Sequence, residues 1–152
     1  MSRTRLTRTI NAPLDRVFAT VADPVNYREA VPQITKVEFL TDQRTGAGTR
    51  FLETREMRGR EAATELEVTE YVKGERIRLV SKAGGTVWDC VFTVTPAGDG
   101  RGTRLDLVME ARPYRLLAHV FVPLTKRIVA KAVARDMDAV KAYLEDVQTD
   151  AD

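Results

Sequence analysis

The middle of the chain alternates apolar and polar residues, and short glycine-containing turns separate the alternating runs. Because successive side chains of a β-strand point to opposite faces, a period of two is typical of strands with one buried face. The pattern predicts six strands, over residues 34–41, 48–57, 60–71, 75–82, 86–95 and 103–111. Turns this short join antiparallel neighbours, so the sequence predicts an antiparallel sheet.

The two ends of the chain complete the expected order of elements. Residues 3–10 also alternate and predict a seventh strand, at an edge of the sheet. Pro13 and Pro24 fit the first turns of two short helices, which lie between this strand and the next. After the last strand, apolar residues recur at helical spacing and predict one long helix over residues 113–147, followed by a short tail over 148–152.

This order predicts an α+β fold, in which a seven-stranded antiparallel curved sheet wraps around a long C-terminal helix. A length of 152 residues fits a single domain over residues 1–152. The formal net charge is only +2 and Lys and Arg form no long runs, so we expect no nucleic-acid partner.

The sequence contains few residues of the types that bind metals or form disulfides. Cys90 is the single cysteine, which excludes an internal disulfide framework and a cysteine-rich zinc site and fits a cytoplasmic location. With one histidine as well, the chain cannot supply a histidine-rich metal site. Nucleotide-binding loops are also missing, and we expect no cofactor.

The most apolar stretch, LLAHVFVPLTKRIV, begins at Leu116 and contains a proline. Its uncharged part, from Leu116 to Thr125, is ten residues long, whereas a membrane-spanning helix needs about 20 apolar residues. We therefore expect no membrane insertion. The stretch is interpreted as the first half of the long helix, buried over the sheet and kinked or started by Pro123.

The turns also predict how the strands pair. Two-residue turns at Arg58-Gly59, Lys73-Gly74 and Gly84-Gly85 give registers that place one set of apolar residues on a common inner face. The set is Phe51, Leu66, Val68, Ile77, Leu79, Trp88, Cys90, Phe92, Val94, Leu105, Leu107 and Met109. Inward polar residues gather toward one end of this face: Glu53, Arg55, Thr64, Ser81 and Thr86. They indicate either the polar end of a pocket or solvated strand ends.

Several segments resemble the START-like, or SRPBCC, superfamily and its polyketide cyclase/dehydrase branch. They are INAPLDRVFATVADPVNY, GAGTRF, ELEVTEYVKGERIRL, VFTVTPAGDGRGTRLDL and the final helix with VFVPLTKRIVAKAVARDMDAVKAYLE. The resemblance covers nearly the whole chain and implies the helix-grip fold, with a deep hydrophobic cavity between the sheet and the final helix. The superfamily includes ligand carriers, cyclases, aromatic-ring oxygenases and quinone-binding proteins, so the fold alone does not decide the function.

The pattern and the resemblance together predict a cavity that takes a small hydrophobic molecule: a lipid, polyketide, quinone or aromatic compound. The expected cavity residues are Phe51, Thr64, Leu66, Leu79, Ser81, Trp88, Cys90, Phe92, Leu107, Met109, Leu117, Phe121, Leu124 and Ile128.

Three sets of residues can carry chemistry in such a cavity. His119 is either an acid or base toward a carbonyl compound, or a locally bonded or solvent-facing histidine. Glu53 and Arg55 either orient or enolise a polyketone, or form a salt bridge at the rim. The tyrosines bind a ligand oxygen or lie at the core edge with their hydroxyls in water; they are Tyr27, Tyr71 and Tyr114.

Two main functions remain open from the sequence. The first, which we favour, is binding of the hydrophobic ligand without a reaction. The second is a polyketide cyclase or dehydratase that acts by confinement and acid/base catalysis without a metal or nucleotide cofactor. A protein-protein adaptor is a third, weaker interpretation. Apolar residues on the outer sheet face are compatible with a homodimer contact: Val87, Val91 and Val108.

Overall fold

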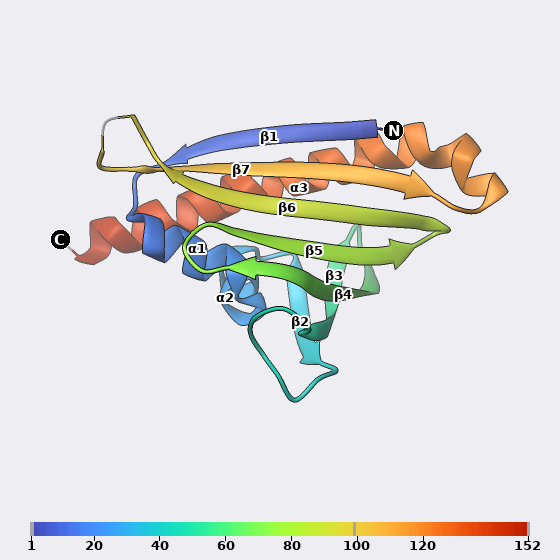
Figure 1. Ribbon diagram of the computed structural model, residues 1–152, viewed down its shortest axis with the longest axis horizontal. Helices are drawn as coiled ribbons and strands as arrows, with labels where there is room; N and C mark the ends of the chain where they lie inside the picture. Colours follow the sequence, from blue (N-terminus) through green and yellow to red (C-terminus); the bar gives the residue numbers. More distant parts are fainter. Residues whose placement is uncertain (1, 99, 152) are drawn as a thin grey trace.

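The computed structural model describes residues 2–98 and 100–151 (Figure 1). Its elements follow the order β1 Ser2–Ile10, α1 Leu14–Ala22, α2 Pro24–Ala30, β2 Ile34–Phe39, β3 Arg50–Met57, β4 Arg60–Val72, β5 Arg76–Ala83, β6 Thr86–Pro96, β7 Thr103–Pro113 and α3 Leu116–Ala151. All neighbouring strands pair antiparallel, in the order β1-β7-β6-β5-β4-β3-β2. The predicted α+β fold is confirmed, with the first strand at an edge.

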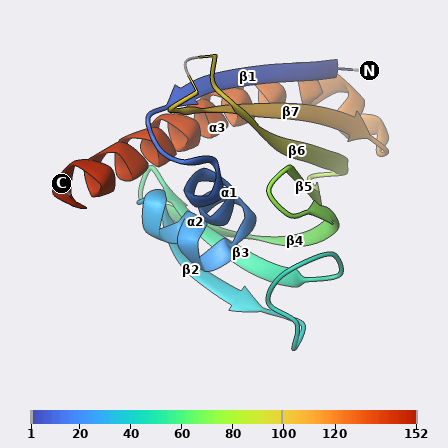
Figure 2. The ribbon, with the colours of Figure 1, turned by 60° about the vertical axis from the view of Figure 1, so that its left-hand side comes forward.

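The sheet curves, and all three helices lie on its concave side (Figures 1 and 2). The long helix α3 runs behind β1 and β7 and packs on both strands. The short helices α1 and α2 pack on each other and on α3, between that helix and the part of the sheet formed by β2 to β4 (Figure 2).

The second short helix begins as the sequence predicts. The Asp23 carboxylate accepts hydrogen bonds from the backbone N–H groups of Val25, at 2.8 Å, and Asn26, at 3.1 Å. These bonds satisfy two donors that have no partner within the helix, and Pro24 occupies a first-turn position that needs no donor. The cap fixes the direction in which α2 leaves α1, and so the position of Tyr27 one turn later.

The predicted strand registers are confirmed in all three hairpins. Phe51 faces Leu66, for example, and Leu79 faces Cys90. One turn differs from the prediction. In the β4–β5 hairpin Val72 pairs with Arg76, so the turn is one residue longer than expected, and a bulge between Val68 and Glu70 restores the predicted pairing beyond it.

The long helix differs from its predicted bounds at both ends. It begins at Leu116 rather than at Pro113, because β7 continues to Pro113 and the next residue turns back, with the Tyr114 N–H donating to the carbonyl of Gly85 at 2.8 Å. It continues to Ala151, so the predicted tail is wrong for residues 148–151; no glycine or proline there ends a helix. Residue 152 lies outside the described residues. In the described chain, no helix is long and apolar enough to cross a bilayer.

The core consists of two packing clusters. The larger one joins α1, α2 and the second half of α3 to the middle of the sheet, around residues such as Val17, Phe92 and Val140. The smaller one joins the first half of α3 to one end of the sheet, and contains Trp88, Met109, Ala111, Ala118 and Val122. The predicted inner face of the sheet is confirmed, because its residues are divided between these two clusters.

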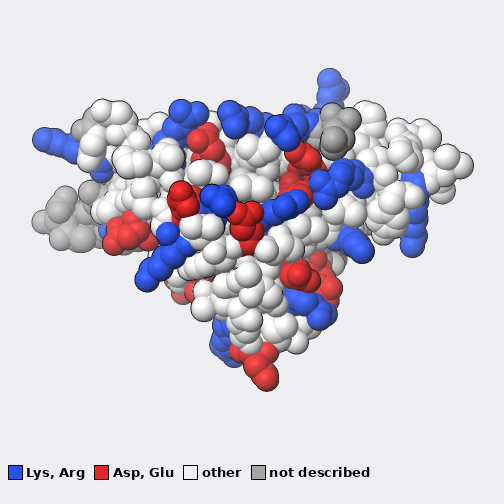
Figure 3. All heavy atoms as spheres, in the orientation of Figure 1, with Lys and Arg blue, Asp and Glu red and all other residues white. Residues whose placement is uncertain are grey.

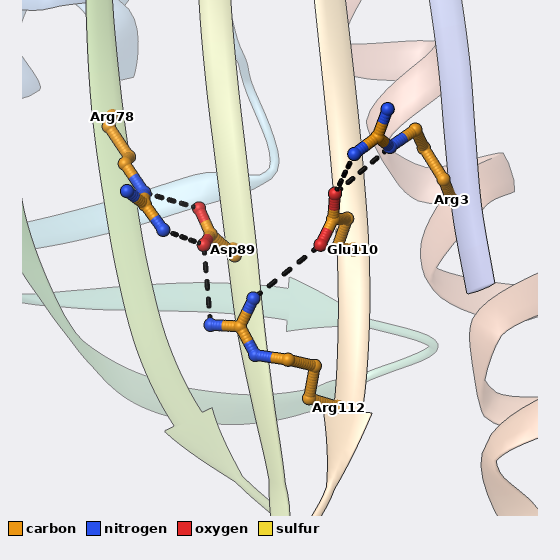
Figure 4. A network of polar contacts seen from close by, with 5 residues as sticks. All are labelled: Arg3, Arg78, Asp89, Glu110 and Arg112. Atoms are coloured by element: carbon orange, nitrogen blue, oxygen red, sulfur yellow. Dashed lines mark hydrogen bonds and ion pairs between the residues drawn. The ribbon is translucent and has the colours of Figure 1, made fainter. Parts of the chain in front are cut away.

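The outer face of the sheet carries paired charges. The Asp89 carboxylate binds the guanidinium groups of Arg78 and Arg112, and Arg112 also reaches Glu110, which pairs with Arg3 (Figure 4). The network links β5, β6, β7 and β1 in turn, which are neighbours in the sheet. Opposite charges on adjacent strands stabilise the registers described above.

Candidate functional site

A cavity of about 130 Å³ lies between the sheet and the helices. Its wall comes from α1, α2, α3 and five strands, and consists of Val21, Ala22, Pro24, Tyr27, Phe51, Glu53, Arg55, Leu66, Val68, Ile77, Leu79, Cys90, Phe92, Leu107, Val133 and Asp136. An engineered apolar cavity of about 150 Å³ holds benzene, so this volume accepts a single aromatic ring. Leu66 and Leu79 are only partly buried, which makes the wall accessible from outside along β4 and β5.

Six of the predicted cavity residues lie on this wall. They come from five strands and are Phe51, Leu66, Leu79, Cys90, Phe92 and Leu107. Their alternation in the sequence was sufficient to place them, because the registers bring the inward side chains of neighbouring strands side by side.

Two other groups of predicted cavity residues lie elsewhere in the sheet. Trp88 and Met109 are buried in the smaller cluster under the first half of α3. Thr64 and Ser81 are half-buried on β4 and β5, outside the cavity wall. The long helix α3 packs mainly on β1 and β7, which lie at the other edge of the sheet from β3 and β2.

The prediction that the first half of α3 covers the cavity is wrong. The side chains of Leu117, Phe121, Leu124 and Ile128 are exposed, Leu117 at 73% and Leu124 at 63%. The helix instead turns Ala118 and Val122 toward the sheet, where they pack near Trp88. Small side chains at these positions let the helix approach the large indole closely, which directs the larger side chains outward.

A cluster of four polar side chains forms one part of the cavity wall. The guanidinium of Arg55 on β3 donates to both oxygens of Asp136 on α3, at 3.0 Å to Oδ1 and 2.6 Å to Oδ2. Its Nε donates to Oε1 of Glu53 at 2.7 Å. The Tyr27 hydroxyl on α2 donates to Oδ2 of Asp136 at 3.0 Å, and the Tyr27 ring packs edge-on against Phe92. Asp136 is only 2% exposed, so the cluster is fixed within the interior.

Burial and charge set the protonation states of this cluster. Burial, together with the negative charge of Asp136, raises the pKa of Tyr27 well above its ordinary value. Burial alone lowers the pKa of Arg55, but its hydrogen bonds with Asp136 and the charges of Glu53 and Asp136 outweigh this effect, so that its pKa lies above the ordinary value. Both groups therefore keep their protons at neutral pH.

Cys90 lines the same cavity as an apolar wall residue. Burial, with a smaller contribution from the charge of Asp89, raises the pKa of its thiol to about 12. The thiol is protonated at neutral pH and is not a nucleophile, because the thiolate is the reactive form.

The other sequence candidates do not join this cluster. His119 is exposed on the first half of α3, and Tyr114 is exposed just before it. Tyr71 packs edge-on against Phe18, with ring centres 5.5 Å apart. Glu53, Arg55 and Tyr27 are therefore the predicted polar residues that the fold brings together. In the described part of the chain, no three potential metal ligands come close enough to hold an ion.

Asp136 is the polar residue of the site that the sequence analysis missed. It lies between Val133 and Val140, at the spacing of the buried stripe of α3. A single acidic residue within a buried helical stripe requires a cationic partner in the core. That signal predicts an inward cation on the facing sheet, and Arg55 is such a residue.

Solved structures with the same architecture share little sequence identity with this chain. The Zhui aromatase/cyclase from Streptomyces sp. R1128 is 17% identical with a TM-score of 0.77, covering 95% of this chain and 93% of that chain. A START superfamily protein from Mycobacterium smegmatis is 16% identical with a TM-score of 0.73, covering 95% and 98%. TTHA0849 from Thermus thermophilus is 19% identical with a TM-score of 0.74, covering 94% and 97%. At these identities the likeness establishes the fold, and no curated protein matches the chain.

A family model gives the stronger result, because it matches residues 1–145, nearly the whole chain. The family is described as polyketide cyclase / dehydrase and lipid transport. The chain belongs to the polyketide cyclase / dehydrase and lipid transport family.

Proposed function

We propose that this protein binds a small hydrophobic ligand in the cavity. The ligand carries an apolar ring and a neutral hydrogen-bond donor, such as a hydroxyl group. The observation that carries the proposal is the composition of the wall, in which an apolar surface surrounds one cluster of mutually bonded polar groups. Pockets of this kind gain affinity from apolar contact and orientation from a few fixed polar groups.

The charges of the cluster favour a neutral donor over an anion. Glu53 and Asp136 are two carboxylates and Arg55 is one guanidinium, so the formal charge beside the cavity is negative. Among the described residues, Arg55 donates to Oε1 of Glu53, and Oε2 accepts no hydrogen bond. This oxygen is the acceptor available to a ligand hydroxyl, whereas a ligand carboxylate meets like charge.

The protonation states support binding over acid/base chemistry. A general acid or base works best with a pKa near the working pH. Tyr27 and Arg55 both have pKa values raised above their ordinary ranges, and the Cys90 thiol stays protonated. These groups can hold and orient a ligand, and none of the three exchanges protons readily at neutral pH.

Three matched probes test the proposal by isothermal titration calorimetry. The probes are 4-methylphenol, its methyl ether 4-methylanisole, and the anion 4-methylbenzoate. We expect 4-methylphenol to bind most tightly, the ether to bind at least about tenfold more weakly through loss of one hydrogen bond to a charged group, and the anion to bind weakest. Preferential binding of 4-methylbenzoate contradicts the proposal.

A cavity-filling variant locates the bound probe. Cys90→Phe places a ring inside the cavity and should abolish binding of 4-methylphenol. Val87→Phe is the matched control, because it adds the same ring on the same strand and Val87 lies outside the cavity wall. If both variants lose binding equally, or if neither loses it, the probe binds outside the cavity. Native mass spectrometry of the purified protein then identifies any compound that the cavity retains.

A second candidate function is ring closure or dehydration of a polyketide-like substrate. The observation that favours it is Glu53, a cavity carboxylate with one oxygen that no described residue occupies. As a base Glu53 takes a proton from a carbon between two carbonyl groups, while the cavity confines the segment that closes into a ring. That carbon attacks a ketone carbon of the same chain, the ketone oxygen takes up the proton as a hydroxyl group, and the hydroxyl leaves as water with a second hydrogen from the attacking carbon. A synthetic linear poly-β-ketone thioester, followed by mass spectrometry for loss of water, is the assay. Turnover that Glu53→Gln abolishes while 4-methylphenol still binds establishes this function.

A further inference from the structure

The first half of α3 presents a stripe of large apolar side chains to the outside. Leu117, Phe121, Leu124 and Ile128 follow one another at spacings of four, three and four residues, so they lie on one side of the helix. All four are exposed, and the opposite side of the helix, with Ala118 and Val122, packs on the sheet. We call these four residues the α3 stripe. Contiguous exposed apolar surface of this kind marks an interaction site.

Positive charges continue the α3 stripe along the helix. Lys131 and Arg135 follow Ile128 at the same alternating spacing, and Arg127 lies beside it. All three cations are exposed, and no described acidic residue forms an ion pair with them. Between Tyr114 and Arg135 the sequence contains no aspartate or glutamate. In Figure 3 the end of the molecule at which α3 begins is largely uncharged and shows Lys and Arg without red side chains.

We propose that the α3 stripe and these cations dock the protein on an anionic lipid bilayer surface. Helices that lie in a membrane interface combine a row of large apolar residues with Lys and Arg, and bind through both apolar burial and attraction to anionic headgroups. The apolar side chains enter the headgroup region, and Arg127, Lys131 and Arg135 contact the lipid phosphates. The helix lies on the bilayer without crossing it. This inference is independent of what the cavity holds.

A second copy of the chain fits this surface less well. An antiparallel pairing that buries both stripes brings Lys131 and Arg135 of one copy toward Arg115 at the start of the other helix. With no acidic residue in this part of the chain, such a contact sets like charges against one another. An anionic bilayer both buries the apolar side chains and attracts the positive charges.

Flotation with lipid vesicles tests the proposal. Vesicles of phosphatidylcholine alone are compared with vesicles that contain about one-third phosphatidylglycerol, at low and at high salt. We expect binding to the anionic vesicles, at least tenfold weaker binding to the neutral ones, and a decrease with salt because the attraction to the headgroups is screened. Binding to both vesicle types alike, or to neither, overturns the proposal.

Two sets of variants separate the apolar and the charged contributions. Leu117→Ser with Leu124→Ser should abolish flotation, and Arg127→Gln with Lys131→Gln should weaken it by about fivefold for each charge removed. The controls are Leu40→Ser and Lys73→Gln, exposed residues away from α3 that should leave flotation unchanged. Circular dichroism confirms that each variant folds, as expected for exposed positions.

Sedimentation equilibrium without lipid measures the oligomeric state, and so tests whether a second copy of the chain covers the α3 stripe instead. We expect a monomer that floats with anionic vesicles. A wild-type dimer that the Leu117→Ser/Leu124→Ser variant converts to monomers assigns the α3 stripe to self-association and overturns lipid docking.

Discussion

Asp136 on α3 and Arg55 on β3 form a two-point ion pair, although they lie 81 residues apart in the sequence. The planar guanidinium matches both carboxylate oxygens, which fixes direction as well as distance. The long helix α3 packs mainly on β1 and β7, at one edge of the sheet. The pair therefore holds the middle of the helix at a fixed rotation over the cavity.

Loss of this pair should destabilise the fold. Asp136→Asn leaves the Arg55 guanidinium, which is 20% exposed, without its buried carboxylate, and we expect the free energy of unfolding in urea to fall by about 3 kcal/mol. The exposed pair Arg50–Glu65 is the control, and Glu65→Gln should cost less than about 1 kcal/mol. Equal effects of the two substitutions contradict a structural role for the Asp136 pair.

Stability should depend on Asp89 in acid. Hydrogen bonds from Arg78 lower the pKa of Asp89, and burial opposes this only in part. A group with a lowered pKa in the folded protein contributes its full stability above the ordinary aspartate pKa of about 3.9, and loses it as the pH falls through the folded value. The stability difference between the wild type and Asp89→Asn should stay constant from about pH 5 to 7 and shrink below about pH 4. If the stability difference between the wild type and Asp89→Asn stays constant down to the lowest pH measured, Asp89 does not stabilise the fold in this way.

The Cys90 thiol should react slowly. A pKa of about 12 leaves very little thiolate at pH 8. We expect its reaction with Ellman's reagent to be on the order of 1000-fold slower than that of a cysteine placed at exposed Thr45, with Cys90→Ser as background. 4-Methylphenol in the cavity should slow the Cys90 reaction further and leave the Thr45→Cys reaction unchanged. Comparable rates at the two positions rule out the buried, protonated thiol.

The β3–β4 turn should accept a stabilising substitution. Arg58 has a φ of +54° and Gly59 has a φ of +78°, the left-handed conformation at both central positions that favours Asn-Gly. Arg58→Asn should raise the free energy of unfolding by about 0.5–1 kcal/mol, because asparagine adopts this conformation more readily than arginine. Arg60→Asn, on the adjacent strand, should give no gain. If both substitutions raise the free energy of unfolding, the loss of a positive charge explains the effect rather than the backbone conformation of the turn.

The sequence predicts the sheet well because alternation and turns constrain one another. A one-residue slip reverses every side chain of a strand, so the registers are largely determined by which residues must be buried. The β4–β5 hairpin shows the limit of the method. Its turn is one residue longer than predicted, and the bulge before Glu70 compensates. Burial of Val68 opposite Leu79 determined the pairing, whereas the turn itself did not.

Apart from Tyr27 on α2, the site is predicted only on its sheet side. Helical spacing groups the residues of α3 into stripes, but it does not say which stripe faces the sheet when both are apolar. Hydrophobicity favours Leu117 and Phe121 for the interior, whereas the fold buries Ala118 and Val122, because the volume of Trp88 leaves room only for small side chains. The orientation depends on long-range packing that no local pattern contains.

The division of the interior into two clusters has an evolutionary consequence. Substitutions around Phe92 alter what the cavity admits, while Trp88 and Val122 keep the start of the long helix attached to the sheet. Ligand preference can therefore diverge among descendants of such a scaffold without loss of the fold.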